Sequence, residues 1–214
     1  YPSKGKERIK SMIETRPDWC VSRQRVWGVP LPIFISKKTG DVLVDDEVFE
    51  NIAKIYEKEG SDCWFNEDYQ IFLGDKYKAE DYEKLSDIVE VWFDSGSTHS
   101  FVLEKRDDLK WPASMYLEGS DQHRGWFHSS LLESCGTRGV APFESILSHG
   151  FVVDGKGLKM SKSTGNVIAP QDILKKYGAD ILRIWVASSN YAEDLRIDYS
   201  ILDQHAESYR KIRN

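Results

Sequence analysis

One stretch organises the sequence: Asp154-Gly155-Lys156-Gly157-Leu158-Lys159-Met160-Ser161-Lys162-Ser163-Thr164-Gly165-Asn166. Its three glycines leave the backbone free to adopt positive φ and to approach a ligand closely. Its three lysines place ammonium groups on one short loop that is rich in hydroxyl side chains. A polyphosphate would supply the missing negative charge, bound by ammonium groups, hydroxyls and backbone N–H groups together. The spacing is not that of a Walker A loop, and a solvated basic hairpin is the alternative interpretation.

Apolar runs and helical segments alternate around this loop. We expect strands at residues 88–93, 115–117 and 146–153, the last of which leads into the loop. We expect helices at residues 122–135, 172–177 and 179–187. The alternation predicts the α/β class, with a Rossmann-like, doubly wound parallel sheet over residues 88–197. Ligands of such sheets bind at the carboxyl ends of the strands, which here are Asp94-Ser95-Gly96, Glu118-Gly119-Ser120-Asp121 and His149-Gly150.

Residues 29–87 have the pattern of a small α+β insertion. Two apolar runs around a polar turn predict a β-hairpin, with the parts Ile33-Phe34-Ile35, Lys38-Thr39-Gly40-Asp41 and Val42-Leu43-Val44. Asp45 or Asp46 is expected to cap a helix that ends at Gly60. Residues 61–87 are acidic and aromatic and are expected to hold short helices only.

Length and charge limit the remaining interpretation. The chain has 214 residues, enough for one large domain or two small ones. It contains no run of about 18 apolar residues, so no membrane partner is expected. The net charge of −6 gives no global attraction to nucleic acid, so an RNA contact would need a local basic patch, such as residues 4–10 or 210–213.

The two ends of the chain read as cuts in a longer protein, because the first residue is Tyr1 and the last residues resemble the middle of a helix. Residues 1–17 are polar and basic, and an extended segment follows over residues 19–28. We therefore interpret residues 1–28 as a connector and the first segment of the core.

Cysteine and histidine spacing predicts no metal site. Cys20, Cys63 and Cys135 lie far apart and form no Cys-x-x-Cys pair. An odd, sparse set of this kind is typical of reduced thiols in a cytoplasmic protein. The five histidines show no zinc-ligand spacing.

The segment Glu118-Gly119-Ser120-Asp121-Gln122-His123 is a second candidate for ligand binding. Gly119 would let a ligand approach the backbone, and Ser120 or Asp121 is suited to the N-cap of the following helix. Carboxylates at a strand end can accept hydrogen bonds from ribose hydroxyls. Simple helix capping is the alternative, but it leaves Glu118 and Gln122 without a role.

Two tryptophans are expected near the same strand ends. Trp126 lies one helical turn after Gln122, and Trp92 lies just before the turn at Asp94. Two indoles beside a ligand site can form a rigid apolar pocket. Ordinary core packing is the alternative for both.

Four strings, in the same order along the chain, resemble the isoleucyl-tRNA synthetase family, which belongs to the class I aminoacyl-tRNA synthetases. They are Trp19-Cys20-Val21-Ser22-Arg23-Gln24-Arg25, Val91-Trp92-Phe93-Asp94-Ser95-Gly96-Ser97, Tyr116-Leu117-Glu118-Gly119-Ser120-Asp121-Gln122-His123-Arg124-Gly125-Trp126-Phe127 and Lys159-Met160-Ser161-Lys162-Ser163. The last string looks like the KMSKS signature of class I enzymes. Valine enzymes resemble the first and last strings, but typically lack the wording of residues 93–99.

The resemblance implies a role for each matched residue. The adenylate-binding residues would be Glu118, Gly119, Asp121, Gln122 and His149, together with the signature residues Lys159, Met160, Ser161, Lys162 and Ser163. Trp92 and Trp126 would wall the pocket for the isoleucine side chain. Lys159 and Lys162 would be catalytic, because they would stabilise the triphosphate as the isoleucine carboxylate attacks the α-phosphorus. Such a transfer needs positioning and charge stabilisation rather than a side-chain nucleophile.

The resemblance also implies cofactors, partners, a cellular compartment and an oligomeric state. ATP and Mg²⁺ would be the cofactors, isoleucine and tRNA(Ile) the partners, and the protein a cytoplasmic monomer. The His-x-Gly-His tetrad that the family uses for ATP is absent from these residues, and so is the editing domain that hydrolyses mischarged valine. We therefore expect the second half of a split catalytic domain, with residues 198–214 beginning the helical domain that reads tRNA. A non-catalytic nucleotide- or RNA-binding module of the same fold and a ligase for valine are the alternatives.

Overall fold

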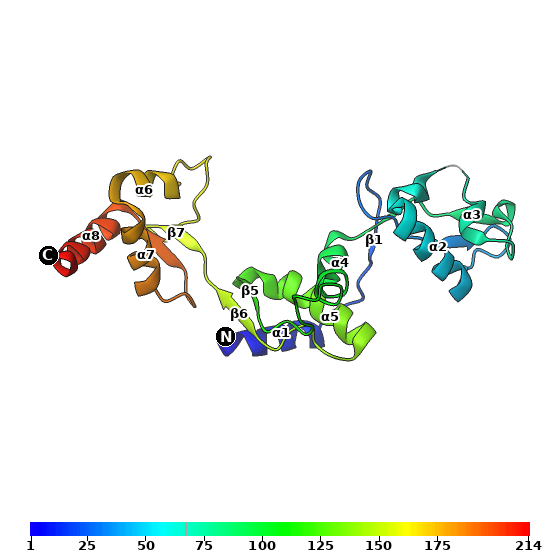
Figure 1. The fold of residues 1–214 in the computed structure, drawn as a ribbon, viewed down its shortest axis with the longest axis horizontal. Helices are drawn as coiled ribbons and strands as arrows, with labels where there is room; N and C mark the ends of the chain where they lie inside the picture. The colour runs from blue at the N-terminus through cyan, green and yellow to red at the C-terminus, as the bar shows by residue number, and fades with distance from the viewer. Residues whose placement is uncertain (67) are drawn as a thin grey trace.

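The computed structural model describes residues 1–66 and 68–214. The molecule is elongated, and its elements gather in three lobes along the longest axis (Figure 1). The insertion with α2 (Asp46–Glu59) and α3 (Gln70–Leu73) lies at one end, and the pair β5 (Tyr116–Gly119) and β6 (Ile146–His149) lies in the middle. The other end holds α6 (Pro170–Tyr177), α7 (Ala179–Ser188) and α8 (Tyr199–Arg213). None of the helices in the described residues is long and apolar enough to cross a membrane.

The expected connector is helical over most of its length. Helix α1 spans Lys4–Glu14 and has no buried residue. Its lysine, arginine, glutamate and methionine residues are strong helix formers, which explains why a polar segment forms a helix here. Gly5 lies directly against His123, because a Cβ on this glycine would stand 2.8 Å from the His123 Nε2 atom.

Residues 34–82 build a core of their own. Helix α2 spans Asp46–Glu59, is capped by Asp45 and ends at Gly60, as predicted. The expected short helices follow as η1 (Ser61–Phe65), α3 (Gln70–Leu73) and η2 (Ala79–Asp81), while residue 67 lies outside the described residues. The expectation of short helices only is wrong for Tyr82–Lys84, which form strand β3. The buried core side chains are Phe34, Val48, Ile52, Cys63, Trp64, Phe72 and Leu73.

The hairpin prediction is correct for the turn but wrong for the main strand partner. Strand β2 (Phe34–Ser36) pairs antiparallel with β3 (Tyr82–Lys84), with Phe34 opposite Lys84. The expected partner contributes one isolated bridge, between Ile35 and Val42. Val42 is half exposed, whereas Tyr82 packs against the core, so burial favours β3.

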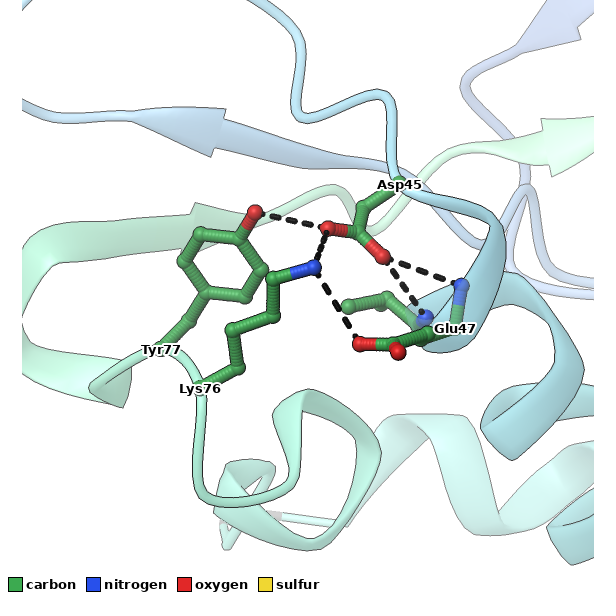
Figure 2. A network of polar contacts seen from close by, with 5 residues as sticks. Asp45, Glu47, Lys76 and Tyr77 are labelled. Atoms are coloured by element: carbon green, nitrogen blue, oxygen red, sulfur yellow. Dashed lines mark hydrogen bonds and ion pairs between the residues drawn. The ribbon is translucent and has the colours of Figure 1, made fainter.

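A polar network fastens the start of α2 to the loop before η2 (Figure 2). The Asp45 carboxylate accepts hydrogen bonds from the backbone N–H groups of Glu47 and Val48. It also accepts from the Lys76 ammonium at 2.6 Å and from the Tyr77 hydroxyl at 2.7 Å. The Lys76 bond, followed by the Tyr77 bond, lowers the pKa of Asp45 to about 2.

The strand expected over residues 88–93 ends early, and its second half is helical. Only β4 (Ile88–Val89) is a strand, and it pairs antiparallel with β1 (Ser22–Arg23). Helix α4 then spans Val91–Gly96, because the Glu90 side chain accepts a hydrogen bond from the Trp92 backbone N–H at 2.9 Å and caps the turn. A π-helical turn, η3, follows over His99–Leu103.

A parallel strand pair with a crossover helix forms the centre of the molecule. Strand β5 (Tyr116–Gly119) pairs in parallel with β6 (Ile146–His149). The single helix expected over residues 122–135 is divided into the 3₁₀ turn η4 (Ser120–Arg124) and helix α5 (Trp126–Arg138). Gly125 separates them, and a Cβ on this glycine would stand 2.5 Å from the Gln122 Oε1 atom, so only glycine leaves room for that side chain.

The strand expected over residues 146–153 is also divided. After β6, strand β7 (Val152–Asp154) pairs in parallel with β8 (Leu195–Ile197). Gly150 lies at the break, where a Cβ would stand 2.2 Å from the Glu193 carbonyl oxygen. Parallel pairs with helical crossovers confirm the α/β class, and within the described residues they form two separate pairs.

The C-terminal helices share one core with β8. Helices α6 (Pro170–Tyr177) and α7 (Ala179–Ser188) confirm the prediction, and Asp198 caps α8 (Tyr199–Arg213). The buried core side chains are Ile173, Ile181, Trp185, Ile197 and Leu202. Helix α8 is therefore packed into this lobe and does not extend free from it.

Candidate active site

The parallel register brings two predicted site residues together. Gly119 at the end of β5 lies opposite His149 at the end of β6. Gly119 is buried, and a Cβ on it would stand 2.6 Å from the Asp121 Oδ1 atom. The His149 Nδ1 atom donates to the Gly150 carbonyl at 2.8 Å, which fixes the ring at the same edge. The carboxyl ends of both strands therefore form one surface, as expected for a ligand site of this fold class.

The carboxylates at this edge face solvent. Glu118 and Asp121 are exposed. The Glu118 Oε2 atom accepts from the Gly119 backbone N–H at 3.3 Å, and the Asp121 Oδ2 atom accepts from the Gln122 amide at 3.2 Å. Each carboxylate keeps free lone pairs, so both can accept hydrogen bonds from ligand hydroxyls.

The capping prediction for Ser120 and Asp121 is wrong. Neither side chain caps a helix, because η4 begins directly after Gly119 and α5 begins after Gly125. Instead, the Gln122 Oε1 atom accepts a hydrogen bond from the Trp126 backbone N–H at 3.0 Å. A glycine inside a helical pattern is a signal for such a break, and this signal was present in the sequence.

The two tryptophans converge on the junction of α4 and α5. The Trp126 indole N–H donates to the Ser95 carbonyl at 2.9 Å. Its ring stacks on Tyr116, with centroids 4.1 Å apart and planes 3° apart. Trp92 lies over Gly125, where a Cβ would stand 3.0 Å from the indole Cη2 atom. Trp126 is half-buried, whereas Trp92 is 42% exposed and can contact a ligand.

The five signature residues of the lysine loop divide into anchors and exposed groups. Met160 packs against the C-terminal core. Ser161 is half-buried, and its hydroxyl lies 2.6 Å from the Thr164 hydroxyl and 3.2 Å from the Ser163 hydroxyl. Lys159, Lys162 and Ser163 are exposed. The loop therefore holds its backbone in place and leaves both ammonium groups available to an anion.

Asp154 and Asn166 clasp the two ends of this loop, which the sequence reasoning did not find. The Asp154 carboxylate accepts from the Asn166 amide at 2.8 Å and from the backbone N–H groups of Lys156 and Leu158. The Asn166 carbonyl accepts from the Ser161 N–H at 2.9 Å. The bond from Asn166, and then that from Leu158, holds the pKa of Asp154 below its usual value.

The structure does not join the lysine loop to the strand-end residues. The loop belongs to the lobe with α6, whereas Gly119 and His149 lie in the middle lobe (Figure 1). Within the described residues, no hydrogen bond or ion pair links the side chains of Lys159 or Lys162 to Glu118, Asp121 or Gln122. In the same residues, no three His, Cys, Asp or Glu side chains gather as a metal site would require.

Comparison with known families identifies the class of protein. Residues 1–198 match the family described as tRNA synthetases class I (I, L, M and V). The chain belongs to this family.

Among individual relatives, it is 87% identical to the isoleucine–tRNA ligase of Pelagibacter ubique, over the whole chain and 24% of that protein. It is 58% identical to the isoleucine–tRNA ligase of Zymomonas mobilis subsp. mobilis, over the whole chain and 23% of that protein. The chain thus spans about a quarter of the length of these relatives.

Two solved structures share the fold. One is the LeuRS of Agrobacterium radiobacter K84 in a ternary complex with tRNA and LeuAMS, with a TM-score of 0.60 and 19% identity over 95% of this chain and 29% of that one. The other is the methionyl-tRNA synthetase of Mycobacterium tuberculosis in complex with methionyl-adenylate, with a TM-score of 0.61 and 17% identity over 97% of this chain and 32% of that one. At these identities the likeness shows the fold alone.

Proposed function

We propose that this chain is part of an isoleucine–tRNA ligase, which activates isoleucine with ATP to isoleucyl-adenylate and transfers it to tRNA(Ile). The observation that carries the proposal is the parallel register that sets Gly119 beside His149, with Trp92 and Trp126 at the adjoining helix junction. Identity of 87% to an isoleucine–tRNA ligase over the whole chain supports the same substrate.

Each part of the site has a proposed task. Glu118 and Asp121 accept hydrogen bonds from the adenylate, with the ribose among the groups bound, and buried Gly119 lets that ligand lie against the backbone. Gln122 holds the Trp126 backbone, and Trp92 and Trp126 wall the isoleucine pocket. Lys159 and Lys162, exposed on the clasped loop, bind the triphosphate and stabilise charge on the transferring phosphoryl group.

The reaction uses positioning and electrostatics. The isoleucine carboxylate is the nucleophile, pyrophosphate leaves, and no side chain of this chain forms a covalent bond. Mg²⁺ commonly binds through one or two carboxylates together with substrate phosphates, so it would arrive with ATP rather than occupy a cage built by these residues. We further propose that the protein acts in the cytoplasm as a monomer.

Amino-acid-dependent pyrophosphate exchange by the full-length protein tests the proposal. Isoleucine is expected to drive exchange at low concentration, valine more weakly, and leucine and methionine not at all. Preference for valine would support the valine ligase, and no exchange with any amino acid would support the non-catalytic module. Lys162→Ala in the same protein is the negative control.

The 214-residue chain by itself is expected to be inactive in this assay. The motivation is that no pair of histidines among the five forms the His-x-Gly-His tetrad. Robust isoleucine-dependent exchange by the purified chain would contradict this expectation.

A further inference from the structure

The helices α4 and α5 touch at a point where one partner is a glycine. Gly96 of α4 is buried, and a Cβ on it would stand 2.2 Å from the Glu133 Oε1 atom and 3.0 Å from the Ser129 hydroxyl. The Glu133 carboxyl therefore lies directly on the α4 backbone. The small buried side chain of Ser129 allows this close approach.

The Glu133 carboxyl forms no ion pair with any of the residues that the structure describes. Both of its oxygen atoms are buried and have no hydrogen-bond partner in residues 1–66 and 68–214. The titratable groups that face this contact are Asp94 of α4 with Glu90 beside it, His99 of η3 on the Gly96 carbonyl, and Tyr116 of β5. The Arg138 guanidinium, carried five residues further along α5, is bound to Glu104 at 3.0 Å. Burial, and then the Asp94 carboxylate, raise the pKa of Glu133 to about 8.

The same helix contact holds the tryptophans. Trp126 lies roughly two turns before Glu133 on α5 and so faces the same side. Its indole is bound to the carbonyl of Ser95, which directly precedes Gly96. Trp92 is carried by α4 itself. A displacement of α4 from α5 would therefore break the bond of Trp126 and move Trp92.

We propose that Glu133 is a positioning residue for the isoleucine pocket. Its neutral acid form lets α4 pack directly against α5, and its ionisation separates the two helices at this junction. The functional part of this inference rests on the proposed isoleucine–tRNA ligase activity. An ionised Glu133 would be an unpaired charge at a buried contact beside a second carboxylate, which is unfavourable unless water enters or the helices separate.

The sign of the pH effect follows from the direction of the shift. The folded-state pKa of Glu133 lies above its unfolded value, so the folded protein keeps a proton that the unfolded chain loses. The packing of α4 against α5 is therefore fully stable below the unfolded-state pKa of 4.5, and its stability falls as pH rises toward about 8. Above that pH the pocket walls should be loose.

Two readouts on the full-length enzyme test the proposal. The first is the ¹⁹F NMR signal of Trp126 in fluorotryptophan-labelled protein, assigned with Trp126→Phe. The second is the KM for isoleucine and for ATP in pyrophosphate exchange. Both are followed from pH 6.5 to 9 in wild type, in Glu133→Gln, which is neutral and of the same shape, and in Glu144→Gln, an exposed control bound to Lys110.

We expect the wild-type Trp126 signal to shift with a midpoint near pH 8, and the isoleucine KM to rise about tenfold for each pH unit above it. Glu133→Gln should abolish both changes, Glu144→Gln should retain them, and the KM for ATP should stay constant. A Trp126 signal that does not titrate in wild type, or that titrates equally in Glu133→Gln, would overturn the proposal. A titrating signal in a protein that activates no amino acid would instead overturn the proposed function and keep the structural inference.

Discussion

Trp126, at the start of α5, and Lys162, on the lysine loop, are held in opposite ways. The Trp126 side chain is fixed by a bond to Ser95 and by stacking on Tyr116. The Lys162 side chain is exposed, and only the loop backbone beneath it is fastened, through Asp154 and Asn166. If the proposed function holds, the wall of the isoleucine pocket is therefore rigid before the ligand binds, whereas the lysine ammonium groups would reach their final positions only on the phosphates of ATP.

The largest effect is expected from the loop. If Lys162 has the proposed role, Lys162→Ala removes a charge contact to the transferring group and should cost about 2.7–4 kcal/mol, or roughly 10²–10³ in the rate of adenylate formation. Isoleucine affinity should change little. Single-turnover adenylate formation by the full-length enzyme measures this, with Lys156→Ala on the same loop as the control. An unchanged single-turnover rate would show that Lys162 has no catalytic role.

An intermediate effect is expected from the pocket. Isoleucine exceeds valine by one methylene, which is worth about 1–3 kcal/mol in a fitted pocket. Trp126→Leu should remove a large part of this discrimination, because it deletes both the Ser95 bond and the Tyr116 stack. Pyrophosphate exchange with both amino acids, run beside thermal unfolding, tests the role. A lower melting temperature with an unchanged isoleucine-over-valine ratio would show that Trp126 is an ordinary core residue.

A smaller effect is expected from the loop clasp. Asn166→Ala removes the bonds to Asp154 and Ser161, each worth about 1 kcal/mol. The lysines would then be less well oriented, and adenylate formation should slow by about tenfold, with an unchanged KM for isoleucine. A changed isoleucine KM with an unaltered rate would show that the clasp does not serve the phosphate end.

The smallest effect is expected far from the site, at Asp45. Its pKa is depressed to about 2, so its stabilising bonds are present above the unfolded value of 3.8 and are lost as pH falls toward 2. Asp45→Asn should make the α2 amides exchange faster at pH 6 and flatten the acid dependence of that exchange. Asp75→Asn, an exposed neighbour, is the control. Equal acid dependence in wild type and Asp45→Asn would contradict the assigned role of the network.

Local sequence signals predicted the elements that depend on local chemistry. Asp45 and Gly60 marked both ends of α2, and Gly178 separated α6 from α7. The strand prediction failed after Val89 because a single capping bond from Glu90 favoured a helix over a β-rich run. The hydrophobic pattern alone gives no information about this capping bond, so it predicts a strand here.

The candidate site was predicted in its residues but not in its supports. Gly119 and His149 were expected at strand ends, and the parallel register sets them side by side. The Trp126–Ser95 bond and the Glu133–Gly96 contact join segments 31 and 37 residues apart in sequence, so only the tertiary structure reveals them. The Asp154–Asn166 clasp is more local, but side-chain amides of loops have many possible partners.

One two-by-two measurement tests the division of labour between pocket and loop most directly. Full-length wild type, Trp126→Leu, Lys162→Ala and the double variant are assayed for isoleucine- and valine-dependent pyrophosphate exchange. The expected result is that Lys162→Ala lowers kcat for both amino acids by the same factor and keeps their ratio, that Trp126→Leu changes the ratio, and that the two effects add in the double variant. A Lys162→Ala ratio that shifts as much as that of Trp126→Leu would contradict it.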